Sequence, residues 1–163
     1  MHAIHIAPAS ERDVPVILGL IHDLAVYEKL AHTVVNTEAA LRRSLFGEPP
    51  AAEVILAWDG EECVGFALFF PNYSTFLGRQ GLYLEDLFVK PHARRRGIGR
   101  ALLVRLAAIA SERGYGRMEW TVLDWNQLAI GFYKKLGAAV LEDWRICRLT
   151  GDALTRLASS PGV

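Results

Sequence analysis

The part of the chain that most limits its fold is a strand, a basic turn and a helix that follow one another without a break. Residues 82–89 are rich in apolar and aromatic side chains that favour a strand, and Pro91 ends this pattern. Residues 97–113 repeat apolar side chains at the spacing of one helix face. Since such a helix must bury its apolar face against the sheet, the chain is predicted to form an α/β structure.

Similar patterns predict the other elements. Apolar residues at helical spacing follow Ser10 and Asp13, which predicts a helix that begins near Asp13. Thr37 is a suitable N-cap for a shorter helix that ends at Gly47. Asp59 and Gly60 predict a tight hairpin. The remaining predictions are strands at 3–7, 53–58, 63–70, 118–123, 138–141 and 145–149, a loop at 71–81 and a helix at 126–136.

The order of these segments predicts one α/β domain over residues 1–163, with a mixed central β-sheet and helices on both faces. A length of 163 residues suits one domain, and 52% of the residues are hydrophobic, which is enough for a sizeable core. The C-terminal tail, at about 158–163, is expected to be frayed.

The charges of the chain are balanced. Lys plus Arg and Asp plus Glu both number 18, so the formal net charge is zero. This balance excludes a protein whose main task is to coat nucleic acid or an anionic membrane, although it allows a local basic site. No apolar run is long enough to cross a bilayer, and the first residues lack the pattern of a signal peptide. We therefore expect a cytoplasmic protein with no membrane or nucleic-acid partner.

The cysteines and histidines indicate neither a disulfide framework nor a metal site. Cys63 and Cys147 lie far apart among apolar or strand-forming residues, which predicts two buried, reduced thiols. The five histidines show no spacing typical of metal ligands, so no metal is expected.

The turn between the strand at 82–89 and the helix at 97–113 has the features of an anion-binding site. Gly97 and Gly99 lie where the first N–H groups of the helix have no partner within the helix and carry partial positive charge. Pyrophosphate is the expected ligand, because five basic side chains add to this charge. These are Lys90, Arg94, Arg95, Arg96 and Arg100. The alternative is an ordinary solvated basic turn.

Glu85 and Asp86 are two carboxylates within an otherwise apolar strand. Both faces of a central strand are usually buried, so this pair requires an explanation. A β-bulge would turn both side chains toward one cleft and free a backbone N–H, an arrangement suited to binding an amine and accepting its proton. The alternative is a strand-end pair that structural arginines neutralise.

The chain resembles the GCN5-related N-acetyltransferase (GNAT) family. The acetyl-CoA motif of that family, Arg/Gln-x-x-Gly-x-Gly/Ala after a central strand, is matched by Arg94, Gly97 and Gly99. The resemblance extends to the diamine acetyltransferase branch, which includes spermidine/spermine and thialysine acetyltransferases. Its blocks occur in order over nearly the whole chain, at 24–28, 83–89, 96–99, 123–126, 132–138 and 144–145.

The resemblance implies acetyl-CoA as the cosubstrate and assigns residues to three parts of it. The backbone of Leu87, Phe88 and Val89 would hold the pantetheine arm. The pyrophosphate would be held by Arg94, Arg95, Arg96, Gly97, Ile98, Gly99 and Arg100. The thiol end would be lined by Asn126, Gln127, Leu128, Ala129 and Tyr133.

The resemblance also implies the catalytic and amine-binding residues. Tyr133 falls on the catalytic tyrosine of the family, and a tyrosine hydroxyl is a suitable acid for a departing thiolate. Glu85, as the proton acceptor of the carboxylate pair, is the second predicted catalytic residue. The implied amine-binding residues are Tyr27, Glu28 and Glu85, with Asp86, Glu119, Trp120 and Trp144 nearby. Ser74 and Phe76 stand where polyamine enzymes carry an acid and a tryptophan, which favours a shorter amine.

Several of these assignments have plain structural alternatives. Tyr27 and Glu28 can belong to a solvated helix end. Trp120 and Trp144 can be core residues. Without the resemblance, Tyr133 is interpreted as a helix tyrosine packed halfway into the core. Asn126 at the start of a helix is also an ordinary N-cap.

The sequence thus predicts an N-acetyltransferase that moves the acetyl group of acetyl-CoA to a primary amine of a small molecule. Neither cysteine lies in an activating setting, so we expect direct attack in a ternary complex. The first alternative is a non-catalytic acyl-CoA-binding or sensor module. The second is a nucleic-acid binder that uses the basic turn, which predicts salt-sensitive binding. A homodimer is implied by the resemblance.

Overall fold

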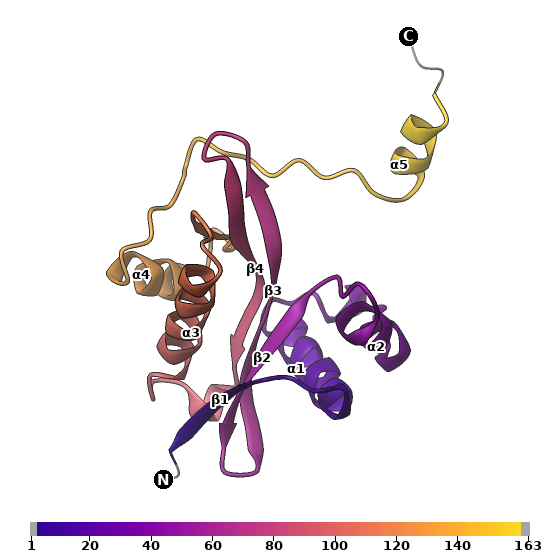
Figure 1. The fold of residues 1–163 in the computed structure, drawn as a ribbon. Coiled ribbons are helices and arrows are strands. Elements are labelled where there is room, and N and C mark those ends of the chain that lie inside the picture. The colour runs from indigo at the N-terminus through magenta and orange to yellow at the C-terminus, as the bar shows by residue number, and fades with distance from the viewer. Residues whose placement is uncertain (1–2, 161–163) are drawn as a thin grey trace. The chain divides into compact units, whose positions relative to one another are not determined.

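A computed structural model describes residues 3–160 of the chain. The chain divides into two compact units, Met1–Thr121 and Val122–Val163. The first unit holds the whole β-sheet and three α-helices, and the second holds two further helices (Figure 1).

The sheet of the first unit is mixed, as the sequence predicts. Its strands lie in the order β1-β2-β3-β4-β5, with antiparallel neighbours from β1 to β4 and a parallel pair of β4 and β5. Their bounds are Ile4–Pro8 for β1, Glu53–Asp59 for β2, Glu62–Ser74 for β3, Arg79–Val89 for β4 and Met118–Trp120 for β5.

Helices cover both faces of this sheet, which confirms the α/β prediction. Helices α1 and α2 lie over one face and α3 lies over the other (Figure 1). The α-helices are α1, Val14–Tyr27; α2, Glu38–Phe46; α3, Ile98–Glu112; α4, Gln127–Lys135; and α5, Gly151–Ala158. Short 3-10 turns occupy Glu11–Asp13, Ala31–Thr33 and Pro91–Ala93.

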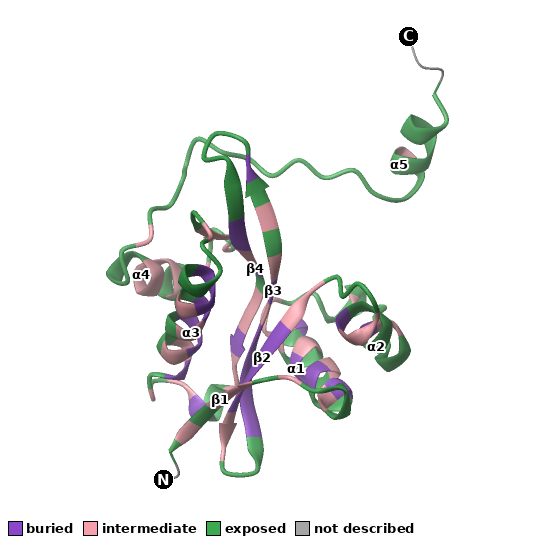
Figure 2. Cartoon of the chain, in the orientation of Figure 1, coloured by how far each residue is buried: buried purple, intermediate pink, exposed green. Residues whose placement is uncertain are grey.

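The central strands are buried on both faces, as Figure 2 shows in purple for β2 and the adjoining part of β3. Residues of β2 alternate between the two faces. Val54 and Leu56 pack in the cluster that α1 and α2 cover, and the intervening Ile55 is also buried. Most of the projecting end of the β3–β4 hairpin is exposed and green in Figure 2.

Local side-chain signals explain where three helices begin. The carboxylate of Asp13 accepts hydrogen bonds from the backbone N–H and the hydroxyl of Ser10, and α1 starts at the next residue. The hydroxyl of Thr37 accepts from Ala40 N–H at 3.2 Å and caps α2. The predicted starts of these helices are therefore confirmed, and Asn126 caps α4 in the same way.

The predicted loop at 71–81 is wrong, because β3 continues to Ser74 and β4 already begins at Arg79. The tight turn between them is closed by Gly78, whose φ is +64° and whose N–H donates to Ser74 C=O. Pro71 does not end β3. Strand β2 pairs with β3 only as far as Phe69, so Pro71 lies where one side of β3 is an edge, and there a missing N–H is tolerated.

The second unit differs most from the prediction. Within residues 122–160, the expected strands at 138–141 and 145–149 do not form, and the helix α5 was not predicted. A strand needs a hydrogen-bonded neighbour, and a run of apolar side chains alone does not supply one. The predicted strand at 118–123 is shortened to β5 for the same reason. Residues 161–163 of the tail expected to be frayed lie outside the described residues.

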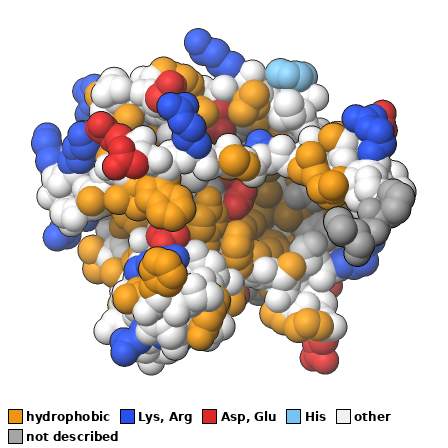
Figure 3. Space-filling model, turned by 90° about the horizontal axis from the view of Figure 1, so that it is seen from above, with side chains coloured by type: hydrophobic (Ala, Val, Ile, Leu, Met, Phe, Trp, Pro, Cys, Tyr) orange, Lys and Arg blue, Asp and Glu red, His pale blue; other side chains and the backbone are white. Residues whose placement is uncertain are grey.

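Both cysteines are free, but only Cys63 is buried, so the prediction of a buried Cys147 is wrong. None of the helices in residues 3–160 is long and apolar enough to cross a membrane. Basic and acidic side chains are interspersed on the face seen in Figure 3, in agreement with the balanced charge of the sequence.

Candidate active site

The basic turn, residues 90–97, joins the end of β4 to the start of α3. Gly97 is the N-cap of α3 and has a φ of +79°, a conformation that L-residues with a side chain adopt at a cost. A Cβ at Gly97 would meet nothing within 4 Å, so the space in front of this helix end is open. Ile98 is buried and anchors the first turn. The first backbone hydrogen bond of α3 runs from Ala101 N–H to Gly97 C=O, which leaves the preceding N–H groups available to an anion.

The basic side chains of this turn do not all project toward an anion. Lys90 forms an ion pair with Glu62 at 3.0 Å, and Arg96 forms one with Asp59 at 2.6 Å. Arg95 and Arg100 are exposed, and no interaction of their side chains is recorded among the described residues. Among the described residues, Arg95 and Arg100 thus have fewer competing contacts than Arg96, and the pyrophosphate-binding roles of all three stay predictions.

Arg94 connects the basic turn to the end of α1. Its Nε donates to the Val89 carbonyl at 2.9 Å, and its guanidinium carbon lies 4.5 Å from the centre of the Tyr27 ring. The Phe88 ring is 5.6 Å away. A guanidinium over a tyrosine face is a favourable cation–π contact. Tyr27, which the resemblance assigns to amine binding, thus also supports the turn.

The backbone of β4 is open on one side next to this turn. Strand β5 pairs with β4 only at Leu82, Tyr83 and Leu84, so residues 85–89 have β3 as their only strand neighbour within the described chain. Alternate peptide groups of an unpaired edge are free to bond an extended ligand. The predicted pantetheine positions, Leu87, Phe88 and Val89, all lie on this open stretch.

The predicted β-bulge is present at Glu85. Leu68 of β3 is opposite Asp86, whereas the next residue, Phe69, is opposite Leu84, which leaves Glu85 as the extra residue. The bulge shifts the alternation of the strand. Asp86 therefore shares the α1 face with Leu68, while Leu84 shares the opposite face with Phe69.

This shift gathers three carboxylates near the end of α1. Burial raises the pKa of Asp86 from 3.8 to about 6, and the nearby charges of Glu85 and then Glu28 contribute. Burial also raises the pKa of Glu28, the residue that ends α1. Three carboxylates with two raised pKa values form a site that an ammonium group would stabilise. Among the described residues, no group of three His, Cys, Asp or Glu side chains is placed to hold a metal ion.

Glu119 and Trp120 lie on β5, opposite Tyr83 and Leu84 of β4. The Glu119 carboxylate forms an ion pair with Arg117 and accepts a hydrogen bond from Asn72 Nδ2 at 3.4 Å. Sequence reasoning missed both partners of Glu119. Arg117 lies only two residues before it in the sequence, a spacing that could have been noticed, whereas Asn72 of β3 approaches it only through the pairing of β3, β4 and β5. Glu119 is therefore already engaged within the sheet.

The remaining predicted residues lie in the second unit. The Asn126 side chain accepts from Ala129 N–H at 3.3 Å, so its alternative role as an N-cap is present. Tyr133 is partly buried on α4, with its ring centre 5.5 Å from that of Phe132. Gln127 donates to the Asp124 carbonyl at 2.6 Å. Leu128 and Trp144 are 86% and 79% exposed.

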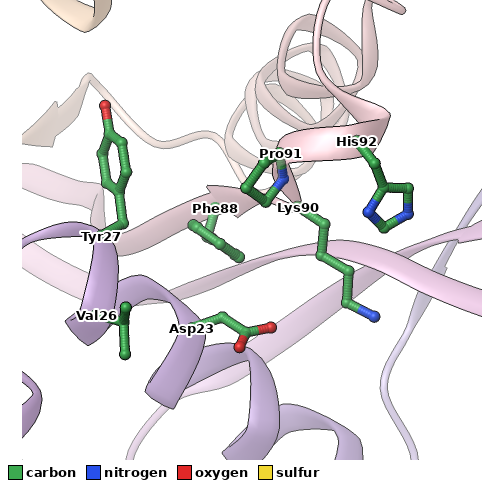
Figure 4. Close-up of a pocket in the computed structure, with 7 residues that line it drawn as sticks. All are labelled: Asp23, Val26, Tyr27, Phe88, Lys90, Pro91 and His92. Atoms are coloured by element: carbon green, nitrogen blue, oxygen red, sulfur yellow. The ribbon is translucent and has the colours of Figure 1, made fainter.

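A groove of about 430 Å³ lies between α1 and the end of β4 in the first unit (Figure 4). One wall comes from α1 and the other from Phe88 and the basic turn. The lining residues are Asp23, Val26, Tyr27, Phe88, Lys90, Pro91 and His92. The groove thus shares Tyr27 and Lys90 with the contacts that hold the turn.

A comparison with protein families shows which family the chain is part of. The description "Acetyltransferase (GNAT) family" fits residues 20–138 of the chain. The chain belongs to the GNAT family. GNAT enzymes transfer an acetyl group from acetyl-CoA, and the open edge of β4 and the basic turn fit its pantetheine and pyrophosphate parts. The chain is therefore an acetyl-CoA-dependent acetyltransferase.

Curated GNAT relatives resemble the chain over most of its length. Thialysine N-epsilon-acetyltransferase from Bos taurus is 41% identical, over 97% of this chain and 99% of its own length. L-ornithine N5-acetyltransferase from Arabidopsis thaliana is 39% identical, over 90% of this chain and 84% of its own length. The branch that the sequence resembles is thereby confirmed.

Solved structures confirm the GNAT fold. An integron cassette protein from the mobile metagenome of V. cholerae matches with a TM-score of 0.82 and 28% identity, over 98% of this chain and 100% of its own. An aminoglycoside acetyltransferase from a soil metagenome matches with a TM-score of 0.78 over 91% of this chain and 97% of its own. Its identity is only 18%, so this likeness concerns the fold alone.

Proposed function

We propose that the protein acetylates a primary amine of a small molecule by direct attack on acetyl-CoA in a ternary complex. The observation that carries the proposal is the cluster of Glu28, Glu85 and Asp86 beside the open edge of β4. Such a cluster attracts an ammonium group, whereas an alcohol would leave the buried charge uncompensated. The adjacent basic turn suits the anionic part of acetyl-CoA.

The reaction needs the amine in its neutral form. The cluster would first bind the ammonium, and a carboxylate of the Glu85–Asp86 pair would take one proton from it. Asp86, with a pKa of about 6, is a stronger base than an ordinary carboxylate and is still ionised at neutral pH. The nitrogen then forms a bond to the thioester carbon while the carbon–sulfur bond breaks. The Tyr133 hydroxyl protonates the departing thiolate. The second amine proton and the proton on the carboxylate pass to solvent, and Tyr133 takes one proton back, so that one proton is released per turnover.

A short amine that carries a second charged group is the proposed substrate. The curated relatives named for thialysine and ornithine support this class. A short amine is also supported by Ser74 and Phe76, which replace the acid and the tryptophan of polyamine enzymes. Ser74 is buried and accepts hydrogen bonds from Leu77 N–H and from Arg117, so it serves the turn of the hairpin. Phe76 is fully exposed.

The test is a panel of amines with the purified full chain, with free CoA thiol as the readout. Ornithine and thialysine are expected to give higher kcat/KM than spermidine or spermine. Tyr133→Phe should lower kcat by about a hundredfold and leave the affinity for CoA unchanged, because the hydroxyl acts only on the departing thiolate. Tyr115→Phe, which changes a tyrosine after α3, is the matched control. Tight CoA binding without turnover of any amine would favour a sensor module instead.

We further propose that both units work as one domain and that the protein is a cytoplasmic homodimer. The family match at 20–138 crosses the boundary between the units, which supports one domain. Two free cysteines suit a reducing compartment. Trp144, Ile146 and Leu157 are each more than half exposed, and a second copy would cover such side chains. Light scattering of the full chain measures the oligomeric state.

A further inference from the structure

Ion pairs join the β2–β3 hairpin to the basic turn. Arg96 Nη1 lies 2.6 Å from Asp59 Oδ2. Lys90 Nζ lies 3.0 Å from Glu62 Oε1, and His92 Nε2 lies 3.3 Å from Glu62 Oε2. Asp59 is the last residue of β2 and Glu62 is the first of β3. Two acidic residues at one hairpin therefore contact three residues of the turn.

The contact of Arg96 with Asp59 is partly shielded from solvent. The Arg96 side chain is only 26% exposed, and that of Asp59 only 20%. A short, charge-assisted hydrogen bond in such a place holds its partners more firmly than an open surface pair does. The start of the turn is also fixed, because Lys90 N–H donates to the Val64 carbonyl of β3 at 2.9 Å.

The Arg96–Asp59 ion pair lies in the part of the turn where the backbone is left-handed. Arg95 and Gly97, the residues on either side of Arg96, both have left-handed backbones, with φ of +63° and +79°. For a residue with a side chain this conformation persists only when its surroundings hold it. The Arg96 side chain supplies such an anchor, and it thereby fixes the direction of the neighbouring N–H groups at the start of α3.

We propose that Asp59 and Glu62 are positioning residues for acetyl-CoA, which hold the basic turn in the shape that binds pyrophosphate. The inference rests on the proposed function, because it concerns the cosubstrate of that reaction. The charge of Asp59 and its role as an anchor predict opposite changes in the affinity for CoA when the carboxylate is removed. As a charge, the Asp59 carboxylate repels an anionic ligand, so its removal alone would tighten CoA binding. As an anchor it strengthens binding, so its removal weakens binding.

The experiment measures the Kd of CoA by calorimetry, and KM and kcat for acetyl-CoA, in the full chain. Asp59→Ala is expected to raise the Kd and KM by about five- to tenfold and leave kcat within about twofold, because the anchor acts on binding. Asp59→Asn should have a smaller effect, since its amide oxygen still accepts from Arg96. Glu62→Gln, which retains a hydrogen-bond acceptor for Lys90, should also raise the Kd.

Glu53→Gln is the matched control. Glu53 lies at the opposite end of β2 and pairs with Arg113 at 2.6 and 2.8 Å, so the substitution removes a comparable charge far from the turn. Its Kd for CoA is expected to equal that of the wild type. Unchanged or tighter CoA binding in Asp59→Ala or in Glu62→Gln would overturn the positioning role of that residue. A wild-type protein that does not bind CoA would instead overturn the proposed function.

Discussion

Replacing Asp86 by Asn removes a charge from a partly buried position in the sheet. Burial raises the pKa of this carboxyl from 3.8 to about 6, and the charges of Glu85 and Glu28 contribute. A difference of one pKa unit corresponds to about 1.4 kcal/mol, so the ionised Asp86 destabilises the fold by at most ~3 kcal/mol. Solvent reaches part of the side chain and screens it, which reduces the expected value to ~2 kcal/mol.

The sign of the effect depends on pH. The pKa is higher in the folded than in the unfolded chain, so the carboxyl is protonated in both states below its unfolded pKa of about 3.8 and costs nothing there. Between about pH 3.8 and 6 the unfolded chain ionises this carboxyl while the folded protein keeps it protonated, so the free energy of unfolding falls as the pH rises and stays lower above about 6. Asp86→Asn should therefore raise the free energy of unfolding by ~2 kcal/mol near pH 7.5 and change it little near pH 4.

Urea denaturation of the full chain at these two pH values measures the difference. Glu85→Gln is the control, because Glu85 is exposed and its removal should alter stability much less. Acetyltransferase activity of Asp86→Asn should fall although the fold becomes more stable, as expected where a site holds an unfavourable charge for function. A gain in stability that is absent, or equal at both pH values, would refute the raised pKa.

Two further predictions concern the basic turn. Gly97→Ala should destabilise the fold by ~1 kcal/mol and weaken CoA binding, since its φ of +79° strains any side chain although the space around it is open. Gly19→Ala is the control, because Gly19 has equal space within the regular helix α1 and its replacement should stabilise the fold by ~0.5 kcal/mol. Denaturation measures the stability of both variants and calorimetry measures their CoA binding. Equal effects of the two substitutions would show that the backbone conformation of Gly97 does not matter. Tyr27→Leu should raise the KM for acetyl-CoA about threefold by removing the ring under Arg94, whereas Tyr27→Phe should not. Steady-state kinetics that give both Tyr27 variants the same KM would show that Arg94 does not need the ring.

Much of the fold can be predicted from the sequence, because its signals act over a few residues. Thr37 caps the helix that begins at the next residue by accepting from the N–H three residues along, and Gly97 both ends the basic turn and caps α3. The bulge at Glu85 could be predicted from two carboxylates in an apolar strand. Where a signal needed a distant partner, prediction failed. Three of the five side chains at 145–149 are apolar, which favours a strand, but no strand pairs with this segment within the described residues.

The sequence by itself determined the order of elements, the basic turn and the kind of chemistry, since these depend on neighbours along the chain. Only the tertiary structure decided which charges meet. Glu28 acts on Asp86 because the bulge turns Asp86 toward the face that α1 covers. Arg96 is paired because the β2–β3 register brings Asp59 beside the turn. Such contacts depend on strand register and helix packing, which set distances between residues far apart in the sequence.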